Sequence, residues 1–91
     1  MTYEPTVKDQ NGNPIQGVLV SVNNEMKKQQ AERSTDGNGY ANVGMEGWEP
    51  TDRVTIAFLD PKMRFQGDVM GDIETVAQAN GKFDVVLDPF V

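Results

Sequence analysis

Apolar residues alternate with polar residues along three segments of the chain, so the pattern has a period of two rather than 3.6. In the first segment, Val18, Val20 and Val22 share one face. The two later segments repeat the alternation with β-branched or aromatic residues, which suit a pleated strand. Because successive side chains of a strand point to opposite faces, the pattern predicts half-buried β-strands. The three predicted strands cover residues 15–22, 53–59 and 82–87.

Turn-forming residues separate these segments. Asn, Asp, Gly and Pro cluster at residues 9–14, 36–39, 60–61 and 80–81. Gly and Asn tolerate positive φ, and Pro fixes φ near −65°. Asn80 and Gly81 lie between two strand-like segments, which predicts a hairpin with a two-residue type I′ turn. The spacing of the turns predicts about seven short antiparallel strands packed as an all-β sandwich.

The remaining strands are predicted from weaker patterns. One stretch, residues 25–33, contains good helix formers, but it has no apolar stripe at helical spacing. We therefore expect a loop there that runs into a charged edge strand, since charge discourages edge-to-edge pairing. The weaker strands are predicted at residues 6–8, 28–35, 40–43, 63–69 and 73–79.

Length and charge limit the function further. The chain has 91 residues, which predicts one domain spanning residues 1–91, since domains commonly run to about 100–150 residues. Eight Lys and Arg residues against fourteen Asp and Glu residues give a net charge of −6. We therefore expect neither nucleic acid nor an anionic membrane as a partner, because binding phosphate groups requires a basic face.

The residue types that the chain lacks exclude several kinds of chemistry. It contains no Cys and no His, so disulfides, zinc–thiolate sites and histidine general bases are impossible. We expect a protein that is not an enzyme and that uses no cofactor and no metal. The first residues lack the basic start and apolar run of a signal peptide. The longest apolar run, residues 56–59, is far shorter than the roughly 18 residues of a membrane span.

Two motifs in the first half of the chain resemble those of a known group of domains. Residues 7–20 combine an Asp/Asn/Gly turn, Pro14 with Ile15, then Gly17 and alternating valines. Residues 35–41 read Thr-Asp-Gly-Asn-Gly-Tyr-Ala. Both are similar to carboxypeptidase-regulatory-like and bacterial Ig-like domains. The resemblance implies an Ig-like or transthyretin-like (prealbumin-like) β-sandwich, and a role as a spacer, adhesin, enzyme appendage or decoration on a tailed-phage virion.

An alternative interpretation of the first turn is a calcium loop. Asp9, Asn11 and Asn13 alternate like the first ligands of such a loop. However, Gly12 stands at the fourth position rather than the sixth, and no Glu follows at the twelfth. Ordinary turn chemistry, in which Asp and Asn bind the backbone of their own turn, is the simpler interpretation.

Apolar residues without a predicted place in the core are candidates for protein contacts. Trp48 is flanked by acidic residues between a glycine and a proline, and it is either a core residue that closes one end of the sandwich or an exposed anchor. Methionine offers an adaptable contact, and apolar residues at the end of a chain fray unless they are bound. The candidate contact residues are Trp48, Met63, Phe65, Met70, Phe90 and Val91.

These observations favour a non-enzymatic structural or binding module. The expected form is a virion surface component, such as a capsid decoration, head-fibre or tail-associated protein, made in the host cytoplasm. Its partner would be a larger structural protein of the capsid or tail, or further copies of itself. The alternative is an accessory carbohydrate-binding or spacer domain of a secreted enzyme or adhesin, located outside the cell or on its surface. Trp48 and Tyr40 on one exposed face would favour carbohydrate binding.

Overall fold

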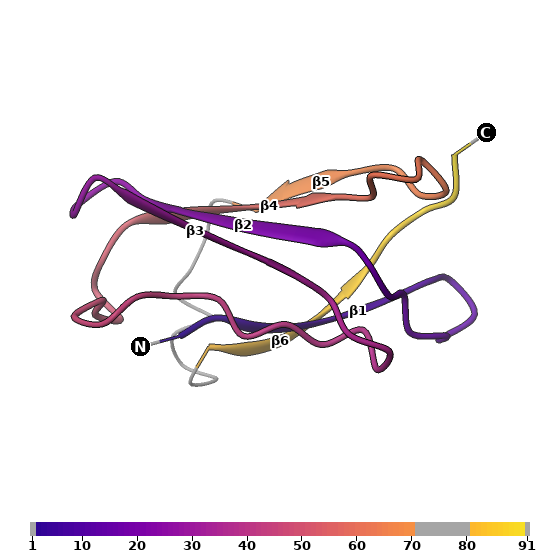
Figure 1. Cartoon of the computed structure of the whole chain (residues 1–91), viewed down its shortest axis with the longest axis horizontal. Helices are drawn as coiled ribbons and strands as arrows, with labels where there is room; N and C mark the ends of the chain where they lie inside the picture. The colour runs from indigo at the N-terminus through magenta and orange to yellow at the C-terminus, as the bar shows by residue number, and fades with distance from the viewer. Residues whose placement is uncertain (1, 71–80, 91) are drawn as a thin grey trace.

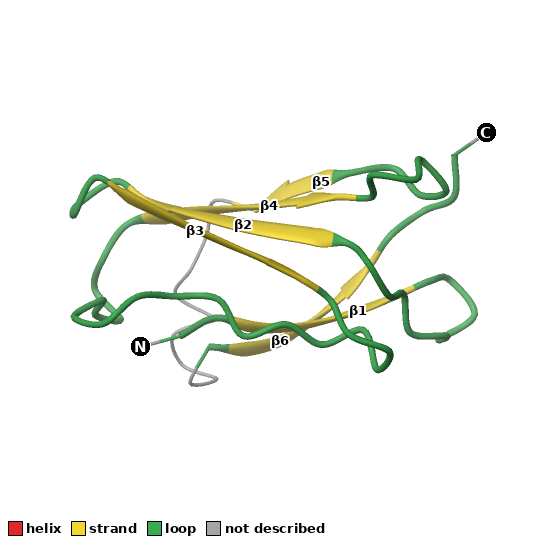
Figure 2. Cartoon of the chain, viewed as in Figure 1, coloured by secondary structure: helices red, strands yellow, loops and turns green. Residues whose placement is uncertain are grey.

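The computed structural model describes residues 2–70 and 81–90. These residues form six β-strands and no helix, so the chain is all-β (Figure 2). The strands are β1 (Glu4–Lys8), β2 (Leu19–Asn24), β3 (Gln29–Ser34), β4 (Val54–Leu59), β5 (Asp68–Met70) and β6 (Lys82–Val86).

The strands form two sheets that face each other as two layers, an arrangement compatible with a β-sandwich (Figure 1). One sheet has four strands in the order β3-β2-β4-β5, and each neighbouring pair is antiparallel. The other consists of β1 and β6. The molecule is elongated, with principal extents of 36 × 22 × 21 Å.

The pairing of β1 with β6 corrects the prediction that all strands are antiparallel. These two strands run parallel, with Glu4 opposite Lys82 and Lys8 opposite Val86. No short loop joins the first strand to the last one, so no hairpin forces them to run in opposite directions. The four-stranded sheet lies between them in the sequence and serves as the long crossover that a parallel pair requires.

The strands predicted at residues 53–59 and 82–87 are confirmed as β4 and β6, and the strand predicted at residues 15–22 is found as β2, which begins only at Leu19 and continues to Asn24. The apolar faces of these segments build the core between the sheets. Val18, Val20 and Val22 are fully buried. The apolar face of β4 is also buried, as are Val85 and Leu87 on and just after β6. The other buried apolar residues are Tyr3, Val7, Ile15, Ala41, Val43 and Trp48.

The weaker predictions have mixed outcomes. Residues 25–28 form a turn that leads into the exposed edge strand β3, as predicted. The predicted strand at residues 40–43 is reduced to isolated bridges, in which Tyr40 pairs with Thr6 and Val43 with Tyr3. The predicted strand at residues 63–69 begins later, because β5 starts at Asp68. The strand predicted at residues 73–79 and the residue Asn80 lie outside the described residues, so the predicted hairpin turn is not tested. Gly81, which is described, has φ of +80°.

The turn before Tyr40 places that residue beside β1. One oxygen of the Asp36 carboxylate accepts hydrogen bonds from the amides of Asn38 and Tyr40, at 2.9 and 3.0 Å. Gly39 has φ of +74°, and a Cβ there would collide with the carbonyl oxygen of Val7. Only glycine fits both constraints, so the turn can lie against β1 and present Tyr40 next to Thr6.

Candidate functional site

Trp48 is part of the core, which corrects its assignment as an exposed contact residue. Its side chain is only 2% exposed. The indole N–H donates a 2.8 Å hydrogen bond to Oε1 of Gln29 on β3, and the ring packs edge-on against Tyr3, with centroids 6.4 Å apart. A buried indole whose N–H has a partner is stable in a core. Trp48 therefore closes one end of the sandwich, the alternative that the sequence left open, and it cannot join Tyr40 on an exposed face.

A buried aspartate fixes the loop that carries Trp48. Asp52 accepts hydrogen bonds from the side-chain amide of Asn24 and from the backbone amide of Glu49, at 2.9 and 3.0 Å. The Lys27 ammonium lies 3.3 Å from the same carboxylate. The bond from the Glu49 amide and the bond from Asn24 hold the pKa of Asp52 below its usual value, and Lys27 adds to this effect. Through these hydrogen bonds and this ion pair, the Asp52 carboxylate connects β2, the β2–β3 turn and the loop before β4.

Three of the other candidate contact residues lie on two segments whose backbones pair, residues 63–65 and 89–90. The loop before β5 and the chain end lie at the same end of the molecule (Figure 1). Met63 and Phe90 are exposed by 67% and 49%, and Phe65 is partly buried against the core. The Phe90 amide donates a 3.1 Å hydrogen bond to the carbonyl of Arg64, and Phe65 forms a bridge with Pro89. We call Met63, Phe65 and Phe90 the C-terminal patch.

The last two candidates add less to this surface. The backbone of Met70 belongs to β5 and pairs with Ile56 of β4. Val91 lies outside the described residues.

A second buried aspartate shapes the loop of the C-terminal patch. Asp60 accepts hydrogen bonds from the amides of Lys62 and Arg64, and from Nε of Arg64 at 3.1 Å. Burial alone would raise the pKa of Asp60, but the hydrogen bonds from Arg64 and Lys62 outweigh it and lower the pKa. Arg64 also donates to the carbonyl of Gln16 at 2.9 Å, which attaches the loop to the segment before β2.

Met63 has an unusual backbone conformation for an exposed apolar residue. Its φ is +56°, in the left-handed region that glycine and asparagine tolerate best. Such a conformation costs a non-glycine residue of the order of 1 kcal/mol, and residues held in this way are common at functional sites. The loop thus keeps a large exposed side chain at a position where glycine would be less strained.

The first turn is held by ordinary turn chemistry. The Asp9 carboxylate accepts hydrogen bonds from the amides of Asn11 and Asn13, both at 2.9 Å. These bonds, first the one from the Asn13 amide, lower the pKa of Asp9. Across residues 2–70 and 81–90, no group of three or more acidic side chains is placed to hold a metal ion. The Asp9 carboxylate thus binds the backbone of its own turn, which is the simpler interpretation given above.

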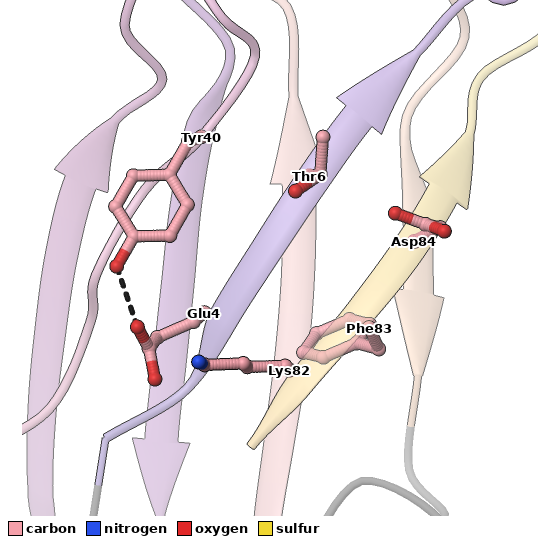
Figure 3. Close-up of a pocket in the computed structure, with 6 residues that line it drawn as sticks. All are labelled: Glu4, Thr6, Tyr40, Lys82, Phe83 and Asp84. Carbon is pink, nitrogen blue, oxygen red and sulfur yellow. Dashed lines mark hydrogen bonds between the residues drawn. The ribbon is translucent and has the colours of Figure 1, made fainter. Parts of the chain in front are cut away.

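An open pocket lies on the outer face of the β1–β6 sheet (Figure 3). Its volume is about 440 Å³. The close-up shows side chains from β1 and β6 and the ring of Tyr40 around one area of the surface. The lining residues are Glu4, Thr6, Tyr40, Lys82, Phe83 and Asp84.

One strong hydrogen bond organises this pocket. The Tyr40 hydroxyl donates to the Glu4 carboxylate at 2.6 Å. This bond, together with partial burial, raises the pKa of Tyr40. The sequence does not predict that Glu4, Thr6 and Lys82 lie together, because their proximity depends on the parallel pairing of the first and last strands. The only available signal was the alternation that turns these polar residues outward.

Comparison with family models, with curated protein sequences and with solved structures finds no match. The described residues also include no helix with the length and apolar character needed to cross a membrane. The function is therefore inferred from the surfaces of the molecule itself.

Proposed function

We propose that this domain is a non-enzymatic module that binds another protein subunit through the C-terminal patch. The observation that carries the proposal is the position of Met63, exposed on a loop that Asp60 and Arg64 hold in place in spite of its positive φ. Met63 is 67% exposed, so burial in the core does not account for an apolar side chain at this position. Phe90 adds a second exposed apolar side chain, and its backbone is bonded to the same loop.

The buried acids support a non-enzymatic role. Asp52 and Asp60 are the charged side chains buried in the described part of the chain, and both accept hydrogen bonds that fix loops. A catalytic acid or base needs a proton that can reach a substrate, whereas these carboxylates are engaged in structure.

Within this class we propose a subunit of a virion surface, such as a capsid decoration, head-fibre or tail-associated protein, with an Ig-like or transthyretin-like fold. The proposal rests on the resemblance of residues 7–20 and 35–41 to domains that occur on tailed-phage virions. A net charge of −6 also suits a subunit that stays soluble until it joins a larger assembly. The partner is then a capsid or tail protein, or another copy of this chain.

The test compares assembly of the wild-type chain with that of a variant in which the patch is polar. In the cell that naturally makes the protein, the wild-type chain should sediment with a larger particle, and Met63→Ser combined with Phe90→Ser should remain in the light fractions. Met26→Ser is the matched control, since Met26 is 65% exposed but lies in the β2–β3 turn. A wild-type chain recovered only as a free monomer, or a patch variant that sediments like wild type, would contradict the proposal.

A further inference from the structure

Polar side chains form two rows on the outer face of the β1–β6 sheet, away from the C-terminal patch. Tyr40 pairs with Thr6 in an isolated bridge and Thr6 lies opposite Asp84, so these three residues form one row. Glu4 and Lys82 face each other in the next row. Neighbouring strands lie about 4.8 Å apart, and residues two apart along a strand about 6.6 Å apart. The array therefore covers an area comparable to one sugar ring.

The array offers both kinds of hydrogen-bonding group. The carboxylates of Glu4 and Asp84 accept hydrogen bonds, the Lys82 ammonium donates them, and the Thr6 hydroxyl does both. Lys82 and Asp84 are exposed, so they are accessible to a ligand. The hydrogen bond from Tyr40 fixes the Glu4 carboxylate before any ligand arrives, which reduces the entropic cost of binding.

This composition disfavours several other classes of ligand. A phosphate or sulfate group would meet two carboxylates and one ammonium, so the local charge opposes it. An apolar molecule would remove water from charged groups without replacing their hydrogen bonds. A neutral polyhydroxylated molecule can donate to the carboxylates and accept from the ammonium at the same time.

A second pocket extends the surface beyond Tyr40. It has a volume of about 430 Å³ and is lined by Arg33, Ser34, Asp36, Tyr40, Ala41 and Asn42. Tyr40 is thus shared by the two pockets. Its partly buried ring lies where a ligand crossing from one pocket to the other would contact it.

We propose that this surface binds a neutral oligosaccharide of hexose or N-acetylhexosamine units. Glu4, Thr6, Lys82 and Asp84 bind the hydroxyl groups of one unit, and Tyr40 contacts the chain between the two pockets. The site is independent of the protein contact proposed above, because it shares no residue with the C-terminal patch.

The test is a titration of the ¹⁵N-labelled full chain, followed by amide chemical shifts. The probes are maltotriose, cellotriose, mannotriose and chitotriose, each added to about 20 mM, which detects affinities in the millimolar range. At least one trisaccharide should produce saturable shifts at the amides of Thr6, Tyr40, Lys82 and Asp84. The absence of saturable shifts at these amides with all four sugars would overturn the proposal.

Variants locate the binding and separate it from the protein contact. Tyr40→Ala, Glu4→Gln and Asp84→Asn should each weaken binding by about tenfold or more, since each removes a ring contact or a charge-assisted hydrogen bond. Well-dispersed spectra of the free variants confirm that they are folded. Glu25→Gln, which changes an exposed carboxylate in the β2–β3 turn, and the Met63→Ser/Phe90→Ser variant should bind like wild type. Unchanged binding in all three pocket variants would overturn the proposal.

Discussion

The two loops that flank β4 are each built around a buried aspartate, and they differ in what the aspartate holds together. Asp52, before β4, accepts hydrogen bonds from Asn24, Lys27 and Glu49, so it joins segments that lie up to 28 residues apart. Asp60, after β4, accepts hydrogen bonds from its own loop, at residues two and four positions further on. The first carboxylate links distant parts of the fold, whereas the second shapes one loop.

The side chains that the two loops carry differ in the same way. The loop before β4 inserts Trp48 into the core, where Gln29 of the edge strand satisfies its N–H. The loop after β4 leaves Met63 exposed at a positive φ. A buried carboxylate therefore stabilises the core at one end of β4, where it fixes the loop of Trp48. At the other end of β4 it fixes a loop that exposes Met63. This division of roles gives four predictions.

The largest expected effect comes from the buried tryptophan. Trp48→Ala should lower the free energy of unfolding by about 3–5 kcal/mol, because it removes a large buried side chain and leaves a cavity. Trp48→Phe retains most of the packing and should cost about 1 kcal/mol for the lost hydrogen bond to Gln29. Urea denaturation followed by circular dichroism measures both. If Trp48→Ala were as stable as wild type, the loop before β4 would not be a stabilising element.

Acid should remove the stability that both aspartates contribute. Because the pKa values of Asp52 and Asp60 are lowered by folding, the stability that they contribute is present above their unfolded pKa, about 3.9, and is lost as the pH falls through the lower folded values. The urea midpoint should thus stay level from neutral pH to about pH 5 and decline below about pH 4.

Replacing each carboxylate tests whether its role is global or local. Asp52→Asn should lower the urea midpoint at neutral pH and make the acid decline shallower. Asp60→Asn should mainly speed hydrogen exchange at the amides of Lys62 and Arg64, which donate to that carboxylate. Equal effects of the two variants on global stability, with no local change in exchange, would show that the comparison is wrong.

The smallest expected effects come from adding or removing a glycine at two positions where the backbone has a positive φ. Met63→Gly relieves backbone strain but adds freedom to the unfolded chain, so stability should range from unchanged to about 1 kcal/mol higher. Gly47, in the loop before β4, has φ of +87°, and Gly47→Ala should destabilise by about 1 kcal/mol. Thermal unfolding of both variants measures the difference. A clear loss of stability in Met63→Gly would mean that the Met63 side chain contributes to folding.

The sequence could predict what depends on neighbours along the chain. The alternation of Val18, Val20 and Val22 requires only a strand with one buried face, and the Asp36 turn requires only an Asp near its own amides. The strand faces and several turns were therefore accessible from local pattern.

Features that depend on distant partners were not accessible. The burial of Trp48 requires an acceptor on β3, and the sequence gives no indication that Gln29 provides it. The outer pocket requires β1 beside β6, two strands separated by most of the chain. Met63 and Phe90, which lie on segments whose backbones pair, were therefore among the predicted contact residues, whereas Glu4 and Lys82 were not.

The parallel pairing of β1 and β6 also determines how the molecule would respond to tension. The described chain begins and ends at opposite ends of the long axis (Figure 1). A force pulling on both termini would slide β1 and β6 past each other, because each strand would be drawn toward its own terminus. The five residue pairs of the ladder would then be loaded together in shear, along with the flanking bonds from Glu4 to Gly81 and from Leu87 to Lys8. Because these bonds share the load, the β1–β6 pair should resist tension better than a pair whose hydrogen bonds break one after another.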